Sequence, residues 1–404
     1  MSVNKSKNMK PDLFQAPDYY QIDDLLTEEH KLVREAAREW VKRDVSPIIE
    51  EYAQNAKFPK QIIKGLADIG AFGPYIPEEY GGAGLDQISY GLIMQEIERG
   101  DSGVRSTASV QSSLVMYPIW KYGNEAQRNK FLPKLASGEW MGCFGLTEPD
   151  HGSNPGGMTT NFKDMGDHYL LNGAKMWISN APLAQVAVVW AKNEEGRIHG
   201  LIVERGMEGF ERGRNLDKMG QKAQDTAELF FSNVKIPKDN VLGEPGKGFL
   251  YLMHGLAEER LQGAVGFIAG ARLAFNITRE FCMERKMFGK TLAHMQNTQF
   301  KMAEMDMEID MAQTYVDHCV DLLNADQLTP EIGAKVKCLT SEIEWKMIDL
   351  GVQLHGGAGY MREYPICEMF TDARVNRIYA GTSEVMKLIV GREIFSDGYS
   401  SILD

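Results

Sequence analysis

The run LAEERL, residues 256–261, lies in the segment that decides the architecture of this chain. Between about residue 248 and residue 280 the apolar residues recur at the spacing of an α-helix; they are Phe249, Leu252, Met253, Leu256, Val265, Ile268 and Leu273. One carboxylate and three glycines share a stripe of this helix, at offsets of 4, 7 and 11 residues: Glu259, Gly263, Gly266 and Gly270. A glycine inside a helix costs about 1 kcal/mol relative to alanine, so three on one stripe indicate that a large group approaches the backbone.

This stripe has two interpretations. A carboxylate at its end, with Arg260 beside it, could be a base that faces a flat ligand. The alternative is close helix–helix packing, with Glu258, Glu259 and Arg260 forming a solvated charge cluster. These residues alone favour the packing interpretation, and the rest of the chain reverses that preference.

The composition is typical of a globular protein with more than one domain. A chain of 404 residues exceeds the usual size of a single core, so two or three domains are expected. Hydrophobic residues make up 43% and charged residues 25%, which is ordinary for a soluble protein. The formal net charge of −12 disfavours general attraction to nucleic acid or to an anionic membrane, so neither is expected as a partner.

Cysteine usage and the N-terminus favour a reducing compartment. The five cysteines are scattered and form no CxxC pair, so the sequence suggests neither a disulfide framework nor a zinc site. No apolar run approaches the roughly 20 residues of a membrane span. Residues 1–21 are polar and lack the apolar core of a signal peptide. We therefore expect a cytoplasmic protein, or one of the mitochondrial matrix if a leader has been removed.

The first part of the chain is predicted to be helical. A polar arm, residues 1–24, precedes a helical domain at residues 25–139. Thr27 can cap a helix whose apolar residues follow a 3.6-residue period. Further helical patterns cover residues 61–69, 88–98, 109–122 and 125–135, the last of them broken by Pro133. The glycine-rich stretch at residues 80–84 lacks GxGxxG spacing and a clear preceding strand, so we interpret it as a connector.

The middle of the chain, residues 140–244, has the pattern of short strands. Residues 169–171, the pair Asn172-Gly173 and residues 175–178 predict a strand, a hairpin turn and a second strand. Further short strands are predicted at residues 186–190, 200–203 and 229–231. Strands do not alternate with helices, so we expect a β-barrel or sandwich and not a doubly wound nucleotide fold.

The last part, residues 245–404, is predicted to be helical again, with helices at residues 248–282, 297–325 and 330–354. Thr329-Pro330-Glu331 is a strong helix start, and His355-Gly356-Gly357 is a plausible stop. A last helix opens at residues 381–384 and runs to about Ile394. Its free N–H groups suit an electron-rich ligand group, although an ordinary capped helix explains them equally. Modules arranged in this way often bind a ligand between them.

Five motifs, in this order and spacing, resemble those of the flavin-dependent acyl-CoA dehydrogenase family. They are GLTEP followed by Gly152-Ser153 (residues 145–153), KMWISN (175–180), ERKMFGK (284–290), QLHGG (353–357) and YAGTSE (379–384). The likeness covers about residues 25 to 395. It implies an α+β fold with an N-terminal helical domain, a middle β-barrel or sandwich domain and a C-terminal helical bundle.

The resemblance also implies FAD as the cofactor and assigns roles to individual residues. The matches to contacts of the flavin ring are Leu146, Thr147, Ser153, Trp177 and Ser179. The matches to residues that reach the FAD of a neighbouring subunit are Arg285, Phe288 and Gln296. Gln353, Gly356 and Gly357 match a second-subunit contact with the adenosine half, and Thr382 and Glu384 match the start of the FAD-binding helix. Because such sites use two subunits, a homotetramer built as a dimer of dimers is implied.

The family removes two hydrogens from an acyl-CoA thioester and produces the trans-2-enoyl-CoA. A carboxylate takes the α-proton while the β-hydride passes to flavin N5. Most members carry this glutamate in a Tyr-Glu-Gly-Thr run, where this chain has Ala380. The isovaleryl and long-chain branches carry it in runs such as Leu-x-x-Glu-Arg-Leu, and Glu259 occupies that position. We therefore predict Glu259 as the base and the backbone N–H of Ala380 as a contact of the thioester oxygen, with the glycine stripe giving room to flavin and thioester.

The substrate is predicted from a second match. Residues 98–113 resemble glutaryl-CoA dehydrogenase, in which the positions of Glu98, Arg105 and Ser109 grip the far carboxylate of the acyl chain. The alternative for Arg105 is a salt bridge to Glu98. The other predicted substrate contacts are Ser153, Arg260 near the CoA phosphates, Tyr379 and Gly381. We rank first a short or medium acyl-CoA, including one with a polar or carboxylate terminus, and second a decarboxylating glutaryl-CoA dehydrogenase.

The partners follow from the same resemblance. Electron-transfer flavoprotein is the expected electron acceptor. Two other classes stay open at this point: an acyl-CoA oxidase that passes electrons to oxygen, and a non-catalytic flavin-binding assembly protein, since Ala380 removes the usual base.

Overall fold

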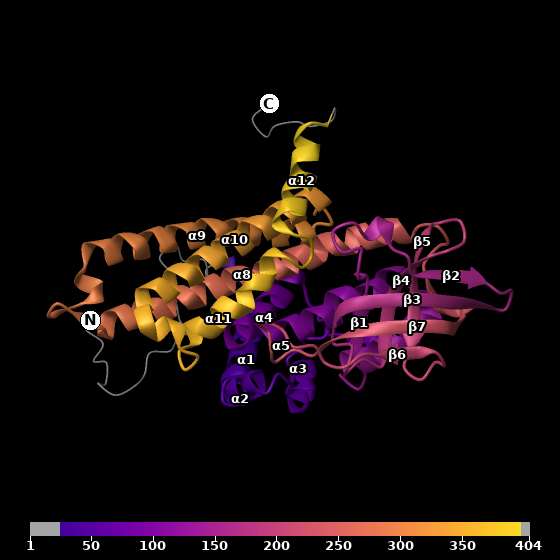
Figure 1. Cartoon of the computed structure of the whole chain (residues 1–404), viewed down its shortest axis with the longest axis horizontal. Helices are drawn as coiled ribbons and strands as arrows, with labels where there is room; N and C mark the ends of the chain where they lie inside the picture. The colour runs from indigo at the N-terminus through magenta and orange to yellow at the C-terminus, as the bar shows by residue number, and fades with distance from the viewer. Residues whose placement is uncertain (1–24, 397–404) are drawn as a thin grey trace.

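Helices form both ends of the chain and strands form its middle (Figure 1). The computed structural model describes residues 25–396, so the predicted arm and the last eight positions lie outside the described residues. The N-terminal elements are α1 (Glu28–Trp40), η2 (Val41–Val45), α2 (Ile49–Gln54), η3 (Lys60–Ile62), α3 (Ile63–Asp68), η4 (Glu78–Tyr80), α4 (Gln87–Gly100), α5 (Ser102–Ser109), η5 (Val110–Met116), α6 (Tyr117–Tyr122) and α7 (Glu125–Ala136).

The predicted start of the first helix is confirmed. The Thr27 hydroxyl accepts a hydrogen bond from the His30 backbone N–H at 3.2 Å. The His30 ring also contacts Asp86 at 2.8 Å, which ties α1 to the residue that caps α4. The cap thus gives an acceptor to one of the backbone N–H groups that have no partner within the first turn of a helix.

Two predictions about the next helices are wrong. The helix predicted from Ser109 begins earlier, at Ser102, because the Asp101 side chain caps it through the Val104 N–H at 2.7 Å. The chain then widens into the π-helical segment η5, which ends two residues before Pro118, whose ring nitrogen has no hydrogen to donate. Pro133 does not break α7, since burial of Phe131, Leu132 and Leu135 in the core outweighs the lost hydrogen bond.

The strands of the middle domain form one connected sheet of eight strands, in the order β6-β7-β3-β2-β4-β5-β8, with β1 parallel to β4. Their bounds are β1 (Gly142–Gly145), β2 (Asn161–Asp164), β3 (His168–Ser179), β4 (Val186–Lys192), β5 (Ile198–Glu204), β6 (Phe210–Arg212), β7 (Thr226–Pro237) and β8 (Val241–Leu242), with η6 (Pro155–Gly157) and η7 (Lys238–Asn240) between strands. The two halves of the sheet meet at the single pair Asn161 and Lys192. A core that includes Leu171, Val189 and Leu229 fills the space between them.

The predicted Asn172-Gly173 hairpin is wrong. Strand β3 continues through both residues, and the turn lies upstream, between β2 and β3, where Gly166 has φ of 94°. Gly173 instead has φ of 139° beside a shift of register against β7. A Cβ there would lie 2.6 Å from the Thr160 hydroxyl oxygen, so the glycine serves a close approach within a bulged strand and not a turn.

The C-terminal helices match the predicted ranges closely. The elements are α8 (Gly248–Glu284), β9 (Lys286–Met287), β10 (Lys290–Thr291), η8 (Leu292–His294), α9 (Gln296–Asn324), α10 (Pro330–His355), η9 (Gly356–Tyr360), α11 (Pro365–Ala373), η10 (Arg374–Arg377) and α12 (Ser383–Ile394). As predicted, Thr329 caps α10 and Gly356, with φ of 60°, follows its end. Among residues 25–396, no helix has the length and apolar character needed to cross a membrane.

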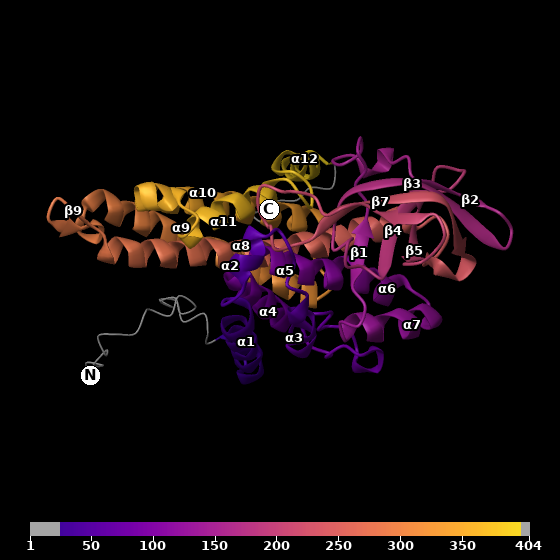
Figure 2. The ribbon, with the colours of Figure 1, turned by 60° about the horizontal axis from the view of Figure 1, so that its bottom comes forward.

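Helix α8 connects the three parts of the molecule. It is 37 residues long, it starts beside the sheet and it runs under α9 and α10, with the N-terminal helices on its other side (Figure 2). Two glycines permit its closest contacts. A Cβ on Gly248 would lie 2.3 Å from the Ile198 carbonyl oxygen of β5, and one on Gly333 of α10 would lie 2.9 Å from that of Ala257. The segment around residues 256–261 therefore faces all three domains.

Candidate active site

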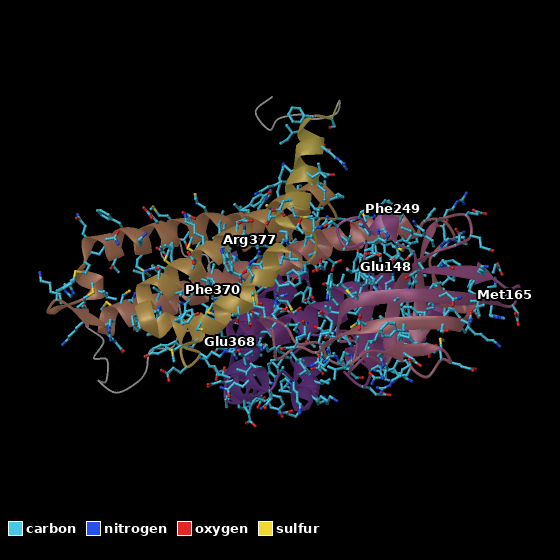
Figure 3. The ribbon with its side chains drawn as sticks, in the orientation of Figure 1. Glu148, Met165, Phe249, Glu368, Phe370 and Arg377 are labelled. Carbon is cyan, nitrogen blue, oxygen red and sulfur yellow. The ribbon has the colours of Figure 1, made fainter. Side chains whose placement is uncertain are left out.

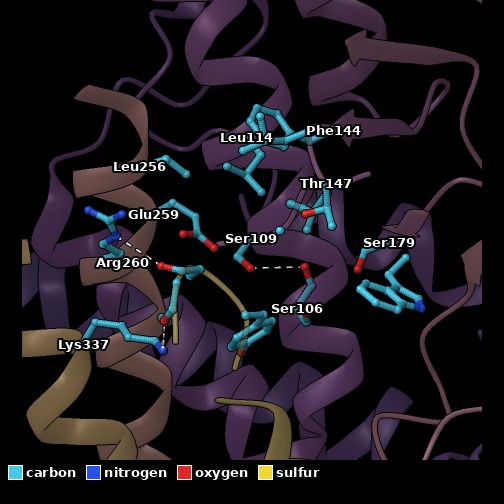
Figure 4. A pocket seen from close by; sticks show the side chains of 18 of the residues that line it. Ser106, Ser109, Leu114, Phe144, Thr147, Ser179, Leu256, Glu259, Arg260 and Lys337 are labelled. Atoms are coloured by element: carbon cyan, nitrogen blue, oxygen red, sulfur yellow. Dashed lines mark hydrogen bonds between the residues drawn. The ribbon is translucent and has the colours of Figure 1, made fainter. Parts of the chain in front are cut away.

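A cavity of about 220 Å³ lies where the three parts meet at α8 (Figure 4). Its walls come from α5 and η5 of the N-terminal domain, from β1, β3 and the loop after β1, and from α8, α10 and the turn before α12. The predicted site residues that line it are Glu259, Ala380, Leu146, Thr147, Ser153, Trp177, Ser179, Arg105, Ser109, Arg260, Tyr379 and Gly381. Sequence positions from 105 to 381 thus converge on one space.

Glu259 carries the unsatisfied carboxylate of the cavity. Its Oε2 is buried and has no hydrogen-bond partner among residues 25–396. Burial raises the pKa of Glu259, while the nearby cations Arg260, Lys337 and Arg105 act in the opposite direction. A carboxyl that is poorly solvated, has a free oxygen and has a raised pKa is suited to accept a proton.

Two cations hold the turn that faces Glu259. Arg260 donates from Nε to the Ala380 carbonyl oxygen at 3.2 Å, and Lys337 donates from Nζ to that of Gly381 at 2.7 Å. Both turn residues have positive φ, 53° for Ala380 and 95° for Gly381. The non-glycine residue in this conformation indicates that the surrounding contacts fix the backbone here.

Lys337 is a site residue that the sequence analysis missed. It lies in α10, is buried, and burial lowers the pKa of its ammonium group to about 8. The only feature of the sequence that points to Lys337 is that a lysine occupies an apolar position in the helical pattern of residues 330–354, and this feature alone does not indicate a functional site. Arg260 is also only 6% exposed, and its contact with a CoA phosphate stays a prediction.

On the other side of the cavity, Trp177 presents its indole. The side chain is 61% exposed, its φ is 58°, and it sits at a shift of register between β3 and β7. A bulge with positive φ re-aims a side chain that regular pleating would direct elsewhere. The hydroxyl groups of Thr147, Ser153 and Ser179 line the same part of the cavity.

A buried ion pair joins the two motifs that carry these residues. Glu148, labelled in Figure 3, accepts hydrogen bonds from the N–H groups of Thr159 and Thr160 at 2.6 and 2.9 Å and from Lys175 Nζ at 2.9 Å. Lys175 also donates to the Leu146 carbonyl oxygen at 3.0 Å. The pair fixes the loop after β1 against β3, and with it the relative positions of Thr147 and Trp177.

Arg105 also lines the cavity, and several side chains orient it. Its Nε donates to Glu98 at 2.5 Å, its Nη2 to the Tyr379 hydroxyl at 3.0 Å and its Nη1 to the Ser109 hydroxyl at 3.4 Å. The salt bridge to Glu98 that the sequence offered as an alternative is therefore present, in a residue that also lines the cavity. Burial alone would lower the pKa of Arg105, but Tyr379 and Glu98 outweigh it and raise that pKa.

The glycine stripe needs correction at two of its three positions. Gly263 lines the cavity, as expected. A Cβ on Gly266 would instead lie 2.9 Å from Arg105 Nε, and one on Gly270 would lie 2.5 Å from an oxygen of Glu344. These two glycines therefore make room for buried charged side chains and not for a flavin.

Glu258 does not belong to a solvated charge cluster. It is 2% exposed, it does not line the cavity, and neither carboxyl oxygen has a hydrogen-bond partner in the described chain. Burial raises the pKa of Glu258 to about 8. The Tyr75 hydroxyl lies near it but donates to the Ser112 carbonyl oxygen at 3.0 Å.

The remaining predicted cofactor contacts do not line the cavity of this chain. Arg285, Phe288 and Gln296 are exposed around the β9–β10 hairpin, and Gln353, Gly356 and Gly357 are exposed at the end of α10. Thr382 caps α12 through the Val385 N–H at 3.2 Å, and Glu384 is exposed on its first turn. The structure does not join these groups to the others, so their contact with a second subunit stays a prediction.

Comparison with known families decides the identity. Three models match in succession: "Acyl-CoA dehydrogenase, N-terminal domain" at residues 27–139, "middle domain" at 143–234 and "C-terminal domain" at 246–395. Long-chain specific acyl-CoA dehydrogenase of Mus musculus is 39% identical over 379 residues, covering 92% of this chain and 88% of that protein. This chain belongs to the acyl-CoA dehydrogenase family. It is an oxidoreductase that acts on CH–CH groups.

Other members of the acyl-CoA dehydrogenase family differ in substrate. The short-chain specific enzyme of Clostridium acetobutylicum is 36% identical over 380 residues, covering 93% of this chain and all of that protein. Glutaryl-CoA dehydrogenase from Mycobacterium smegmatis, solved in complex with FADH2, has a TM-score of 0.90 and 34% identity, covering 95% of this chain and 98% of that one. The predicted family and three-part fold are confirmed, whereas the relatives span short-chain, long-chain and glutaryl names.

Proposed function

We propose that this acyl-CoA dehydrogenase oxidises a short or medium acyl-CoA to the trans-2-enoyl-CoA, with FAD as cofactor and Glu259 as the base. The observation that carries the proposal is that Glu259 lines the cavity and that its buried Oε2 has no hydrogen-bond partner among residues 25–396. Ala380 offers no acid at the position that most relatives use, so Glu259 is the carboxylate available at the cavity wall.

The residues opposite Glu259 suit a flavin ring. The exposed indole of Trp177 offers an aromatic face, and the hydroxyl groups of Thr147, Ser153 and Ser179 offer hydrogen-bonding groups at its edge. When bound, FAD supplies the hydride acceptor of the reaction. The side chains of this chain then have to bind the thioester, exclude water and move the α-proton.

Proton removal would take place at the Glu259 carboxylate. The carboxylate has to be ionised when substrate arrives, and Arg260 and Lys337 support its charge from α8 and α10. The same two cations hold the carbonyl oxygens of residues 380 and 381, which leaves the N–H of Ala380 to contact the thioester oxygen as charge develops. The α-proton leaves its carbon and remains on Glu259.

A matched pair of glutamine variants tests this assignment. Glu259→Gln should keep yellow flavin but lose anaerobic flavin bleaching by acyl-CoA, by at least about 10²- to 10⁴-fold. Glu258→Gln changes the neighbouring buried carboxyl, which does not line the cavity, and should bleach at the parent rate. Bleaching of the Glu259→Gln flavin as fast as that of the parent would refute the base assignment.

A substrate that ends in a carboxylate is the specific form of the proposal that Arg105 favours. A buried guanidinium at the end of an acyl cavity is costly without an anion, and Glu98, Ser109 and Tyr379 already orient it. Decarboxylating glutaryl-CoA dehydrogenase is the second candidate for the same reason. Arg105→Ala should abolish a preference for glutaryl-CoA over butyryl-CoA in kcat/KM; an unchanged preference, or none in the parent, would leave Arg105 structural.

The electron acceptor and the assembly complete the proposal. Electron-transfer flavoprotein is proposed as the acceptor, and a homotetramer as the assembly in which Arg285, Phe288 and Gln296 reach a second FAD. Rapid aerobic turnover without an added acceptor would instead identify an oxidase.

Loss of bound FAD in Arg285→Ala, without loss of folded protein, would support the contact between subunits. We keep a cytoplasmic or matrix location as the expectation.

A further inference from the structure

A cluster of buried carboxyl groups lies behind Arg105, outside the cavity. Its four members come from different elements and are each less than one-tenth exposed: Glu98 of α4, Asp101 before α5, Glu344 of α10 and Asp372 of α11. We call it the tail-end cluster. Arg105 forms its boundary with the cavity, and Glu368 and Lys218 are the charged groups that face it from α11 and from the loop before β7.

The hydrogen bonds of the tail-end cluster leave it short of positive charge. Only Glu98 forms an ion pair within residues 25–396, with Arg105. Asp101 accepts from the Val104 N–H at 2.7 Å, and Asp372 accepts from the Gln221 N–H at 2.6 Å. The Gly103 N–H also stabilises Asp101, so the donors to these two buried carboxyls are neutral backbone N–H groups and not cations.

Glu344 shows the same shortage. It accepts one hydrogen bond, from Asn376 Nδ2 at 2.7 Å, and its other oxygen rests against the backbone of Gly270. The Oδ1 of the fully buried Asn376 has no partner in the described chain. The amide therefore has an acceptor that a proton held in the cluster could satisfy.

Four carboxyl groups around one guanidinium cannot all be ionised in a dry interior, because their repulsion and desolvation favour the neutral form. Burial raises the pKa of Glu344 and of Asp372 well above the ordinary range. For Asp101, burial and the neighbouring acids Glu368 and Glu98 raise the pKa to about 7. Asp101 is thus the member whose charge changes near neutral pH, and the members titrate as an interacting group.

We propose that an acyl chain ending in a carboxylate binds beside Arg105 together with a proton, which the tail-end cluster takes up chiefly at Asp101. The inference rests on the proposed function, in that it needs an anionic tail at Arg105. The added negative charge would lie near Arg105, whose ion-pair partner Glu98 acts electrostatically on Asp101. It therefore stabilises the protonated cluster, and the Arg105–Glu98 pair remains intact.

The pH dependence of binding follows from this linkage. Above neutral pH, affinity for an anionic tail falls by up to about tenfold per pH unit, because the proton taken up becomes scarcer. An uncharged tail takes up no proton here, so its affinity stays independent of this cluster. The difference between two CoA esters isolates the effect, since the CoA part is common to both.

The test uses the FAD-loaded Glu259→Gln protein, which removes turnover and any proton uptake at residue 259. Glutaryl-CoA and butyryl-CoA are titrated near pH 7.5 in weakly buffered solution with a pH indicator. Binding of glutaryl-CoA should cause the protein to take up a substantial fraction of one proton per site, and binding of butyryl-CoA should cause no uptake. Adding Asp101→Asn, which keeps the helix cap, should abolish the uptake and retain binding. Adding Glu344→Gln, a group already neutral, should change neither.

The outcomes separate this inference from the function on which it rests. Glutaryl-CoA that binds without proton uptake, or with uptake that Asp101→Asn leaves unchanged, would overturn the proton-linked subsite and leave the anionic tail intact. If glutaryl-CoA binds the Arg105→Ala protein as tightly as it binds the protein with Arg105, both the proton-linked subsite and the anionic tail at Arg105 would be overturned.

Discussion

Two glutamates, Glu148 and Glu258, are each 2% exposed, yet their pKa values are shifted in opposite directions. Glu148 of the β domain accepts hydrogen bonds from Thr159, Thr160 and Lys175, and these partners overcome the effect of burial and lower its pKa to about 2. Glu258 of α8 has no hydrogen-bond partner within the described part of the chain, and burial raises its pKa to about 8. Burial alone therefore does not decide the state of an acid; the donors around it do.

The same contrast separates structure from function at the site. The satisfied pair in the β domain fixes two motifs beside Trp177. Helix α8 instead carries two adjacent carboxyls whose oxygens lack partners among residues 25–396, and only Glu259 of the two lines the cavity. An unpartnered buried carboxyl lowers stability, and at Glu259 it leaves an oxygen free to accept a proton.

Breaking the satisfied pair should have the largest effect on stability. Lys175→Met leaves Glu148 buried without its cation, which should lower the free energy of unfolding by about 3–5 kcal/mol. Denaturant unfolding measures this value. The double variant Lys175→Met/Glu148→Gln should recover part of the loss, and a single-variant loss below about 1 kcal/mol would contradict the contrast.

Changing the unsatisfied acid should alter the dependence of stability on pH. Between pH 4.5 and 8 the unfolded chain releases the proton of Glu258 while the folded chain keeps it. The free energy of unfolding should therefore fall as pH rises through this window, by up to about 1.4 kcal/mol per pH unit.

Glu258→Gln should remove that contribution and be at least as stable as the parent at pH 8. Glu148→Gln is the matched control with the opposite sign, because the low folded pKa of Glu148 makes stability rise with pH between about 2 and 4.5. Identical pH profiles for the parent and Glu258→Gln would show that Glu258 is solvated.

Lys337→Met should act on the reaction more than on the fold. Removing this cation raises the pKa of Glu259 further, so the rate of anaerobic flavin reduction should reach its plateau at higher pH. Below the plateau the rate falls about tenfold for each unit of change in that pKa. A stopped-flow pH profile checks this, with Lys335→Met on the same helix as control; an unchanged profile would remove Lys337 from the site.

Thr159→Val gives the smallest expected effect. It removes the Thr159 hydroxyl, which donates to Glu148 at 2.8 Å, but leaves the backbone donors and Lys175 in place. The free energy of unfolding should fall by about 1 kcal/mol. If Thr159→Val lowered the free energy of unfolding as much as Lys175→Met does, the ion pair with Lys175 would not be the main interaction that stabilises the buried Glu148.

Local patterns predicted the helical parts well. The apolar periodicity of α8 and the capping residues Thr27, Thr329 and Thr382 are local features, and the structure has each of them. The Asn172-Gly173 pair misled because the same two residues suit a turn or a bulge, and only the pairing of β3 with β2 and β7 decides between them.

The site was predictable where a motif carries it and not where tertiary contacts create it. Glu259 and Arg105 were found from motifs, and both line the cavity. Lys337 and Glu344 lie on α10, more than seventy residues after Glu259, so no spacing in the sequence connects them with α8. The neighbours of Gly266 and Gly270 likewise become visible only when α5 and α10 are packed against α8.

Relocation of the carboxylate tests the central claim most directly. If residues 259 and 380 face the same substrate carbon, Glu259→Gln should abolish anaerobic flavin bleaching and the double variant Glu259→Gln/Ala380→Glu should restore a measurable part of it. Both variants should retain flavin. If the double variant is as inactive as Glu259→Gln, residues 259 and 380 do not face the same substrate carbon. If Glu259→Gln alone bleaches as fast as the parent, Glu259 is not the base.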